Sequence, residues 1–195
     1  GIEAEVEGRD GGLHFWVAPA VAPNGYAWLF PAGPRLQIGV VAFEPRPSDL
    51  SDRLARFLAR LGYAGEPCRG GAIPWFERPA IVDGIFLAGD AAGHCLPLSA
   101  EGIRFALAFG ELAGRLVAEV IDGGLSAEAA HAIYERRAAL HRRRTRWLRR
   151  AQRFAGVLPN RAVDVMASLL AVPPLERRAM TRYAGWSAVR DLGGA

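Results

Sequence analysis

The stretch that decides the fold is Phe86-Leu-Ala-Gly-Asp-Ala-Ala-Gly-His-Cys-Leu-Pro-Leu-Ser-Ala-Glu-Gly-Ile103, which joins one apolar segment to another. The run from Ile81 to Ala88 is continuous rather than alternating, which is typical of a strand buried on both faces. From Ile103 to Ile121 the few charged residues occupy one stripe, so we expect a largely buried helix. A strand, a glycine-rich turn and a buried helix in this order indicate the nucleotide-binding layer of an α/β fold.

The turn itself places one carboxylate among glycines. Asp90, at the end of the expected strand, could accept a hydrogen bond from a sugar or ribityl hydroxyl, and Gly89 and Gly93 would let a ligand approach the backbone closely. The following helix begins near Glu101 and Gly102, so its free N–H groups and positive dipole end would face the same ligand. These features favour a flavin, which gains negative charge at one edge on reduction. The alternative is an ordinary strand-to-helix connection with a capping aspartate.

The sequence of the turn is similar to the second FAD fingerprint of p-hydroxybenzoate hydroxylase-like flavoproteins, and within them it most resembles the geranylgeranyl reductase family. The resemblance rests on GDAAG at 89–93, on Pro97 and on Glu101-Gly102-Ile103. It departs from the family's usual GEGI at Ala100, which stands where the first glycine is usual. The resemblance implies that the ribityl and isoalloxazine groups of FAD are held by Gly89, Asp90, Ala91, Gly93, Pro97, Ser99, Glu101, Gly102 and Ile103.

A second match lies upstream, where Tyr26-Ala-Trp-Leu-Phe-Pro31 followed by Gly39 resembles the YxWxFP…GxG motif of the same family. In that family the motif lines the lipid-binding cavity near the flavin. Val41 replaces its second glycine, which would narrow the cavity or change its preferred substrate. From residue types alone, alternating aromatic residues on one strand face are more often core than ligand wall. The spacing from the turn favours a ligand wall. The resemblance implies that the substrate-binding residues are Tyr26, Trp28, Phe30, Pro31 and Gly39.

The composition excludes several kinds of chemistry. The sequence contains no lysine, so all 24 residues counted as Lys or Arg are arginine. A Schiff base, a Walker P-loop and a pyridoxal-phosphate anchor therefore have no amine to use. The four histidines are not paired at helical ligand spacing, so we expect no metal site. Reduction of a double bond also needs a proton donor, for which the candidates are Cys95, His94 and Tyr26. A His or Cys beside such a turn is more often simply packed there.

The rest of the chain divides by pattern into three parts. Residues 1–66 form a β-rich substrate-binding part, with four short antiparallel strands between 2 and 43 and an amphipathic helix from Ser48 to Gly62. Residues 67–124 form the C-terminal part of a Rossmann-like FAD-binding domain, with buried strands at 70–75 and 81–88. Residues 125–195 form a helical region, started by Ser126 and divided at Pro159 and at the Pro173-Pro174 pair. The fold class is mixed α/β, of the α+β kind.

The fingerprint that binds the ADP half of FAD is missing from this sequence. No G-x-G occurs anywhere in its 195 residues. Family members carry this motif nearer their N-terminus, so the sequence resembles the C-terminal half of a flavoprotein. We expect such a chain to bind FAD poorly by itself. Two cysteines and the lack of a leader-like or membrane-spanning segment indicate a cytoplasmic protein.

The basic residues gather in one segment of the helical region. No acidic residue occurs between Arg136 and Asp164, and apolar residues recur every seven positions at Ile133, Leu140, Trp147 and Phe154. Three interpretations of the segment Arg136–Arg153 compete. It could be a solvated face whose arginines cover the apolar stripe, a surface that docks on anionic membrane lipids, or, least favoured, a nucleic-acid site.

Together, the resemblance implies an FAD-dependent oxidoreductase that reduces C=C bonds of an isoprenoid or other long apolar substrate. Its electron donor would be NAD(P)H or ferredoxin, and it would lie in the cytoplasm or at the membrane periphery. An aromatic monooxygenase or halogenase of the same superfamily is the nearest alternative. A non-enzymatic basic module that binds membranes or nucleic acid is the other.

Overall fold

The computed structural model describes residues 1–22, 25–43, 49–67, 69–74, 76, 78–97, 99–155, 158–170 and 172–186. Contacts divide the chain into two compact units, of which the first comprises 1–72 and 154–172 and the second comprises 73–153 and 173–195. The three-part division at 1–66, 67–124 and 125–195 stays a prediction.

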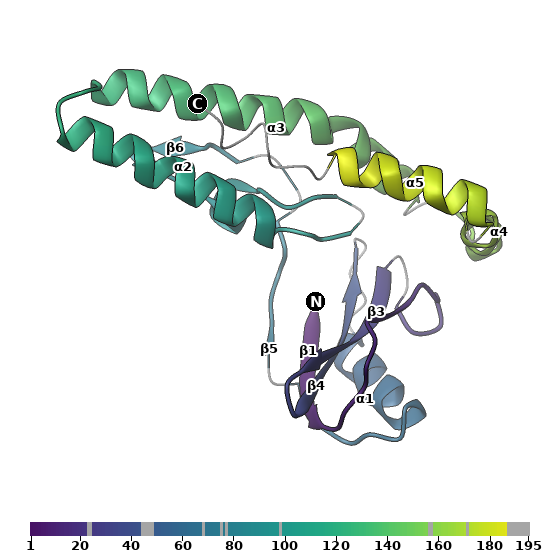
Figure 1. Cartoon of the computed structure of the whole chain (residues 1–195). Coiled ribbons are helices and arrows are strands. Elements are labelled where there is room, and N and C mark those ends of the chain that lie inside the picture. Colours follow the sequence, from purple (N-terminus) through teal and green to yellow (C-terminus); the bar gives the residue numbers. More distant parts are fainter. Residues whose placement is uncertain are drawn as a thin grey trace. The chain divides into compact units, whose positions relative to one another are not determined.

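The first unit is built on a five-stranded antiparallel sheet (Figure 1). Its strands are β1 (Ile2–Glu7), β2 (His14–Trp16), β3 (Gly25–Ala32), β4 (Arg35–Ala42) and β5 (Arg69–Gly70), in the order β2-β3-β4-β1-β5. The four strands expected between 2 and 43 are therefore confirmed. Because strand side chains alternate, each strand contributes one set of residues to the core and the other set to the opposite face.

Helix α1 (Leu50–Arg60) packs its apolar stripe against the core face of this sheet. Leu54, Phe57 and Leu58 are buried there. The helix ends at Arg60 with Leu61 as its C-cap, and Gly62 follows with a φ of +81°, which suits glycine. Ser48, the expected N-cap, lies outside the described residues. Asp49 takes the N-cap position, and its carboxylate accepts a hydrogen bond from Arg53 Nε at 2.9 Å.

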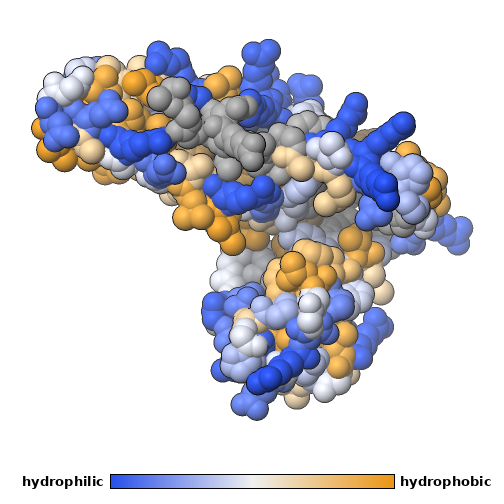
Figure 2. All heavy atoms as spheres, in the orientation of Figure 1, coloured by the Kyte–Doolittle hydropathy of each residue, from blue (hydrophilic) through white to orange (hydrophobic). Residues whose placement is uncertain are grey.

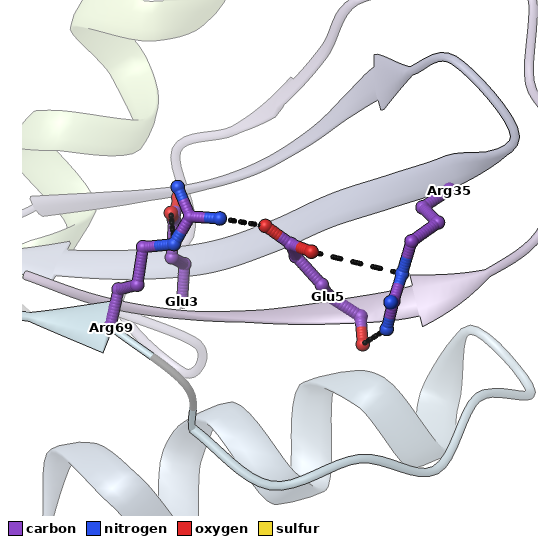
Figure 3. A network of polar contacts seen from close by, with 4 residues as sticks. All are labelled: Glu3, Glu5, Arg35 and Arg69. Carbon is purple, nitrogen blue, oxygen red and sulfur yellow. Dashed lines mark hydrogen bonds and ion pairs between the residues drawn. The ribbon is translucent and has the colours of Figure 1, made fainter.

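The opposite face of β1 carries an ion-pair network (Figure 3). Arg69 contacts the carboxylate of Glu5, and its Nε lies 3.9 Å from Glu3 Oε1. Arg35 donates to the backbone carbonyl of Glu5 at 3.3 Å, and its Nε lies 3.7 Å from the Glu5 carboxylate. The network links β4 and β5 to β1, although exposed pairs of this kind each contribute at most about 1 kcal/mol.

The expectation of two long buried strands before the turn is wrong. Residues 81–86 form a small hairpin of β6 (Ile81–Val82) and β7 (Ile85–Phe86). Of the described residues in the strand expected at 70–75, only Gly70 lies in a strand, as the last residue of β5. Asp83 and Gly84 both have positive φ, 50° and 78°, and this turn interrupts the apolar run. Val82 and Ile85 are exposed, and Trp75 lies outside the described residues.

The second unit contains three helices, α2 (Ile103–Ile121), α3 (Ala127–Ala155) and α5 (Pro173–Trp186). Helix α4 (Asn160–Leu170) belongs to the first unit, so the prolines divide the helical region as expected. Ser126 Oγ accepts a hydrogen bond from the Ala129 N–H at 3.2 Å and so caps α3, as predicted. Among the described residues, no helix is both long enough and apolar enough to cross a membrane.

Helices α2 and α3 lie side by side and form the core of the second unit (Figure 1). Phe105, Phe109, Leu112 and Leu116 of α2 are buried, together with Tyr134 of α3. The expectation that α2 is largely buried is wrong, because only this face is covered. Its other side leaves large apolar side chains exposed: Ile103, Leu107, Val117 and Ile121. Figure 2 shows hydrophobic atoms gathered on this side of α2.

Candidate functional site

The glycine-rich turn begins at Ala88, which is extended with φ −128° and ψ 164°. A single 3₁₀ turn, Gly89–Ala92, follows, and Gly93 ends it in the left-handed conformation. The His94 N–H donates to the Gly89 carbonyl at 2.9 Å, and the Leu96 N–H donates to the Glu101 carbonyl at 2.7 Å. These bonds fold residues 89–101 into a compact loop that leads into α2.

Glycine is required at two positions of this turn. Gly89 and Gly93 have φ values of +61° and +66°, which side chains of L-residues rarely allow. A Cβ at Gly93 would also lie 2.3 Å from the backbone oxygen of Phe76. Both glycines of the GDAAG motif at 89–93 therefore have backbone conformations that favour glycine.

The residues of the resemblance gather around this turn, with different exposure. Gly89, Gly93 and Pro97 are buried and form its frame. Asp90 and Ala91 are exposed at its tip. The α2 end supplies Ser99, Glu101 and Gly102, which are half-buried, and Ile103, which is exposed. Gly102 is the N-cap residue of α2 and makes no side-chain capping bond, so the helix end stays open to a ligand.

Ala100 occupies the position where the family usually has glycine, and its φ is +55°. Replacing Ala100 with glycine is therefore expected to stabilise the protein by about 1 kcal/mol, because the left-handed backbone strains a residue that carries a Cβ. Urea denaturation measures the change. The control is Ala118→Gly at an exposed position in the interior of α2, where the same substitution should destabilise by about 1 kcal/mol. Destabilisation by both changes would contradict the strained turn.

A contact that the sequence did not reveal joins α5 to the residues just before α2. The hydroxyl of Tyr183, in α5, donates to Glu101 Oε2 at 2.6 Å and lies 3.0 Å from Ser99 Oγ. Burial acts to raise the pKa of Glu101, but the bonds from Arg104 and Tyr183 outweigh it and hold that pKa below its ordinary value. Tyr183 lies 82 residues from Glu101, so no local pattern predicts this contact.

Two of the candidate proton donors lie beneath the turn. Cys95 is 1% exposed, and burial, followed by the charges of Asp90 and Glu101, raises the pKa of its thiol to about 12. His94 is stacked on Phe109 with 3.8 Å between ring centroids. Burial, with a smaller effect of Arg142, lowers its pKa to about 4. At neutral pH, Cys95 therefore keeps its proton and His94 carries no charge.

A buried polar cluster on α3 lies next to His94. The His141 ring lies 5.5 Å from the His94 ring, and burial lowers its pKa to about 3. Within the described part of the chain, His94 Nδ1 and His141 Nε2 have no hydrogen-bond partner. Arg149 is 9% exposed and donates to Thr145 Oγ1 at 2.8 Å. The cluster was not predicted, because arginines and histidines of a basic helix were expected at its surface.

The expected substrate wall is an aromatic surface on the first unit. Tyr26, Trp28 and Phe30 are half-buried on the side of β3 that faces away from α1, whereas Ala27 and Leu29 point into the core. Pro31 at the end of the row is exposed. Phe15 of β2 extends the surface, with its ring 5.1 Å from that of Phe30 and 5.9 Å from that of Tyr26. Phe15 was not predicted, because β2 is too short to show a pattern.

Gly39 has a specific role in this surface. It pairs with Trp28 across β3 and β4, and a Cβ at position 39 would lie 2.1 Å from the indole. The indole therefore lies flat against the backbone of β4, which only glycine permits. The turn belongs to the second unit and the aromatic surface to the first.

The arginine segment of α3 is not uniformly solvated, which corrects one expectation. Arg149 is buried, and Arg142 donates to Glu135 Oε2 at 3.0 Å. Arg136, Arg143, Arg146 and Arg150 are exposed. The apolar residues Leu140, Trp147 and Phe154 are also exposed rather than covered.

Comparisons with known proteins support the resemblance, although no protein-family model matches the chain. Digeranylgeranylglycerophospholipid reductase 2 of Methanothermobacter thermautotrophicus is 33% identical over 135 residues, which cover 63% of this chain and 34% of that protein. Digeranylgeranylglycerophospholipid reductase of Methanosarcina acetivorans is 30% identical over 138 residues, covering 63% and 33%. The chain thus spans about a third of the length of these curated relatives.

A crystal structure of a geranylgeranyl bacteriochlorophyll reductase-like protein from Thermoplasma acidophilum shares the fold, with a TM-score of 0.71 and 20% identity. The match covers 98% of this chain and 54% of that one. The mixed α/β fold class, with its antiparallel sheet and helices, is therefore confirmed. Over the part that the curated relatives match, the chain is similar to digeranylgeranylglycerophospholipid reductases.

Proposed function

We propose that this chain forms part of an FAD-dependent reductase that reduces C=C bonds of an isoprenoid or another long apolar substrate. The observation that carries the proposal is the turn at 89–102. It combines the exposed carboxylate of Asp90, two left-handed glycines and a helix end without a side-chain cap. The relatives are named as reductases of digeranylgeranylglycerophospholipid, which supplies the substrate class.

The residues of the turn fit the ribityl and ring part of a flavin. Asp90 is exposed and could accept a hydroxyl hydrogen bond, while the buried Gly89 and Gly93 hold the turn around it in left-handed backbone conformations. Gly102, at the start of α2, lies beside Asp90, because a Cβ at this position would be 3.7 Å from Asp90 Oδ1. A group bound by Asp90 would therefore lie near the first N–H groups of α2. These groups would stabilise negative charge on the bound group.

A bound reduced flavin supplies the hydride, so the protein must supply a proton to the neighbouring carbon. Cys95 holds its proton at neutral pH but is buried beneath the turn, and the neutral His94 is stacked in the core. Tyr26 lies on the aromatic surface that we propose as the substrate wall. The burial of the other two candidates favours Tyr26 as the donor.

The aromatic surface suits a long apolar chain. Phe15, Tyr26, Trp28 and Phe30 form a row of neighbouring rings, with centroid separations between 5.1 and 6.2 Å. An apolar chain lying on these rings would bury surface and gain about 25 cal/mol per Å² of apolar area. We propose NAD(P)H or ferredoxin as the reductant, and contact with an anionic membrane through Arg136–Arg153 as the route to a lipid substrate.

The test uses the protein expressed from the complete reading frame that contains this sequence. We expect a visible flavin absorption band that bleaches on reduction and returns when an isoprenoid lipid with C=C bonds is added without oxygen. Asp90→Ala should weaken FAD binding about 10-fold to 100-fold, because a hydrogen bond to a charged group contributes about 1.5–3 kcal/mol. Asp122→Ala, at the opposite end of α2, is the control and should change the affinity for FAD by less than about twofold.

Two outcomes would overturn the proposal. Absence of flavin from the purified protein would show that the protein does not bind the proposed cofactor. Oxygen-dependent hydroxylation or chlorination of the substrate would indicate a monooxygenase or halogenase instead of a reductase.

A further inference from the structure

A groove lies between α2 and α3 in the second unit. Its α2 residues come from the C-terminal half of that helix, away from the glycine-rich turn. Its volume is about 580 Å³, within the range of small-molecule sites. Its lining combines aliphatic residues with charged ones: Leu112, Leu116, Ile133 and Leu140, with Arg115, Glu119, Arg136 and Arg137. An aliphatic floor with a basic rim is the arrangement that an amphiphile with an anionic head needs.

The charge of the rim favours an anion. Three arginines and one glutamate line the groove. Arg115 donates to Glu111 at 3.2 Å, yet about half of its side chain stays exposed, at 47%. Arg136 is exposed, and Arg137 is partly buried. Guanidinium groups bind phosphate oxygens in a bidentate manner, so two or three of them around one position fit a phosphate well.

Exposed apolar residues lie on the same face of α3 beyond the groove. Leu140 belongs to the groove and is 43% exposed, and Trp147, seven residues further along the same face, is 41% exposed. Exposed Arg143 and Arg150 follow Arg136 at the same seven-residue spacing. Tryptophan and arginine in this pattern are typical of helices that lie at a membrane interface. Figure 2 shows hydrophilic side chains along α3.

We propose that the groove between α2 and α3 binds an anionic phospholipid of the membrane surface. Arg115, Arg136 and Arg137 hold the phosphate, and the aliphatic floor receives the adjoining part of the acyl or isoprenoid chain. The inference rests on the proposed function for its membrane setting and names the groove as the specific point of contact. The charge complementarity and the aliphatic floor favour a lipid over a nucleic acid, because none of the described residues that line the groove is aromatic and could stack on a base.

Vesicle sedimentation of the chain tests this proposal without flavin or reductant, so its result is independent of the reductase activity. The chain should bind vesicles that contain phosphatidylglycerol and should not bind vesicles of phosphatidylcholine alone. Arg136→Gln with Arg137→Gln should weaken binding about 30-fold, since each arginine near an anionic surface contributes a factor of about five. Leu140→Gln should weaken it by about threefold at unchanged net charge.

The matched control is Arg177→Gln with Arg178→Gln, which removes two neighbouring arginines that are exposed on α5. Less than about threefold weakening by this pair supports the groove. Equal weakening by both pairs would show attraction to net charge alone and would overturn it. A short DNA duplex that binds more tightly than vesicles, through Arg136 and Arg137, would overturn it as well.

Discussion

Gly93→Ala is expected to destabilise the second unit by about 2–5 kcal/mol and to abolish the proposed flavin binding at the turn. A Cβ at this position would lie 2.3 Å from the Phe76 backbone oxygen, and the φ of +66° would strain it as well. A left-handed non-glycine residue costs about 1–2 kcal/mol, and a clash with fixed backbone adds about 1–3 kcal/mol. The backbone oxygen cannot rotate away as a side chain could, so the turn itself must shift.

Urea denaturation and FAD titration measure the two effects of this substitution. Gly110→Ala is the control, because Gly110 lies in the interior of α2 and a methyl group added there would meet no atom within 4 Å. That substitution should stabilise the protein by about 0.5–1 kcal/mol through helix propensity. A Gly93→Ala protein with normal stability would show that the turn does not pack against Phe76.

Acidification from pH 7 to pH 5 is expected to destabilise the protein by about 2 kcal/mol for each of two buried histidines. The pKa of His94 is lowered to about 4 and that of His141 to about 3, in both cases first by burial. In the unfolded chain both titrate near 6.5, so the unfolded state binds more protons below that pH. The stability that the neutral histidines provide is therefore complete above pH 6.5. It decreases as the pH falls toward the folded pKa values.

Urea denaturation at several pH values between 7 and 5 tests this expectation, with the slope of stability against pH as the readout. His141→Gln should reduce that slope by about half, whatever it does to stability at pH 7. The control is Leu140→Gln at an exposed position of the same helix, which changes no titratable group and should leave the slope unchanged. Glu101, whose pKa is lowered, loses its contribution only below its ordinary value of 4.5, which is outside this window. An unchanged slope in His141→Gln would contradict the buried, neutral state of the pair.

Sequence patterns predicted most of the fold because most elements have strong local signals. Helix α2 begins at Ile103 and ends at Ile121, as its apolar spacing and flanking glycines indicated. The hairpin at 81–86 was missed because continuous hydrophobicity was given more weight than the Asp83-Gly84 turn. A single apolar run does not show whether a strand is covered on both faces, since that depends on distant segments.

The candidate site was predicted where its residues are contiguous and missed where they are not. The turn at 89–103 forms a compact loop because its glycines are fixed by local backbone geometry. Tyr183 reaches Glu101 from another helix, and Phe15 joins the aromatic surface from a three-residue strand. The buried His141 and Arg149 were missed because composition places such residues at the surface.

The pairing of Trp28 with Gly39 means that the depth of the aromatic surface is set by its neighbouring strand. The indole occupies the volume that any side chain at position 39 would fill. A larger residue at that one position would lift the ring and make the surface shallower, with the core face of both strands unaltered. For the substrate wall that we propose, a single codon of β4 would therefore set which apolar chains fit, without replacing any aromatic residue.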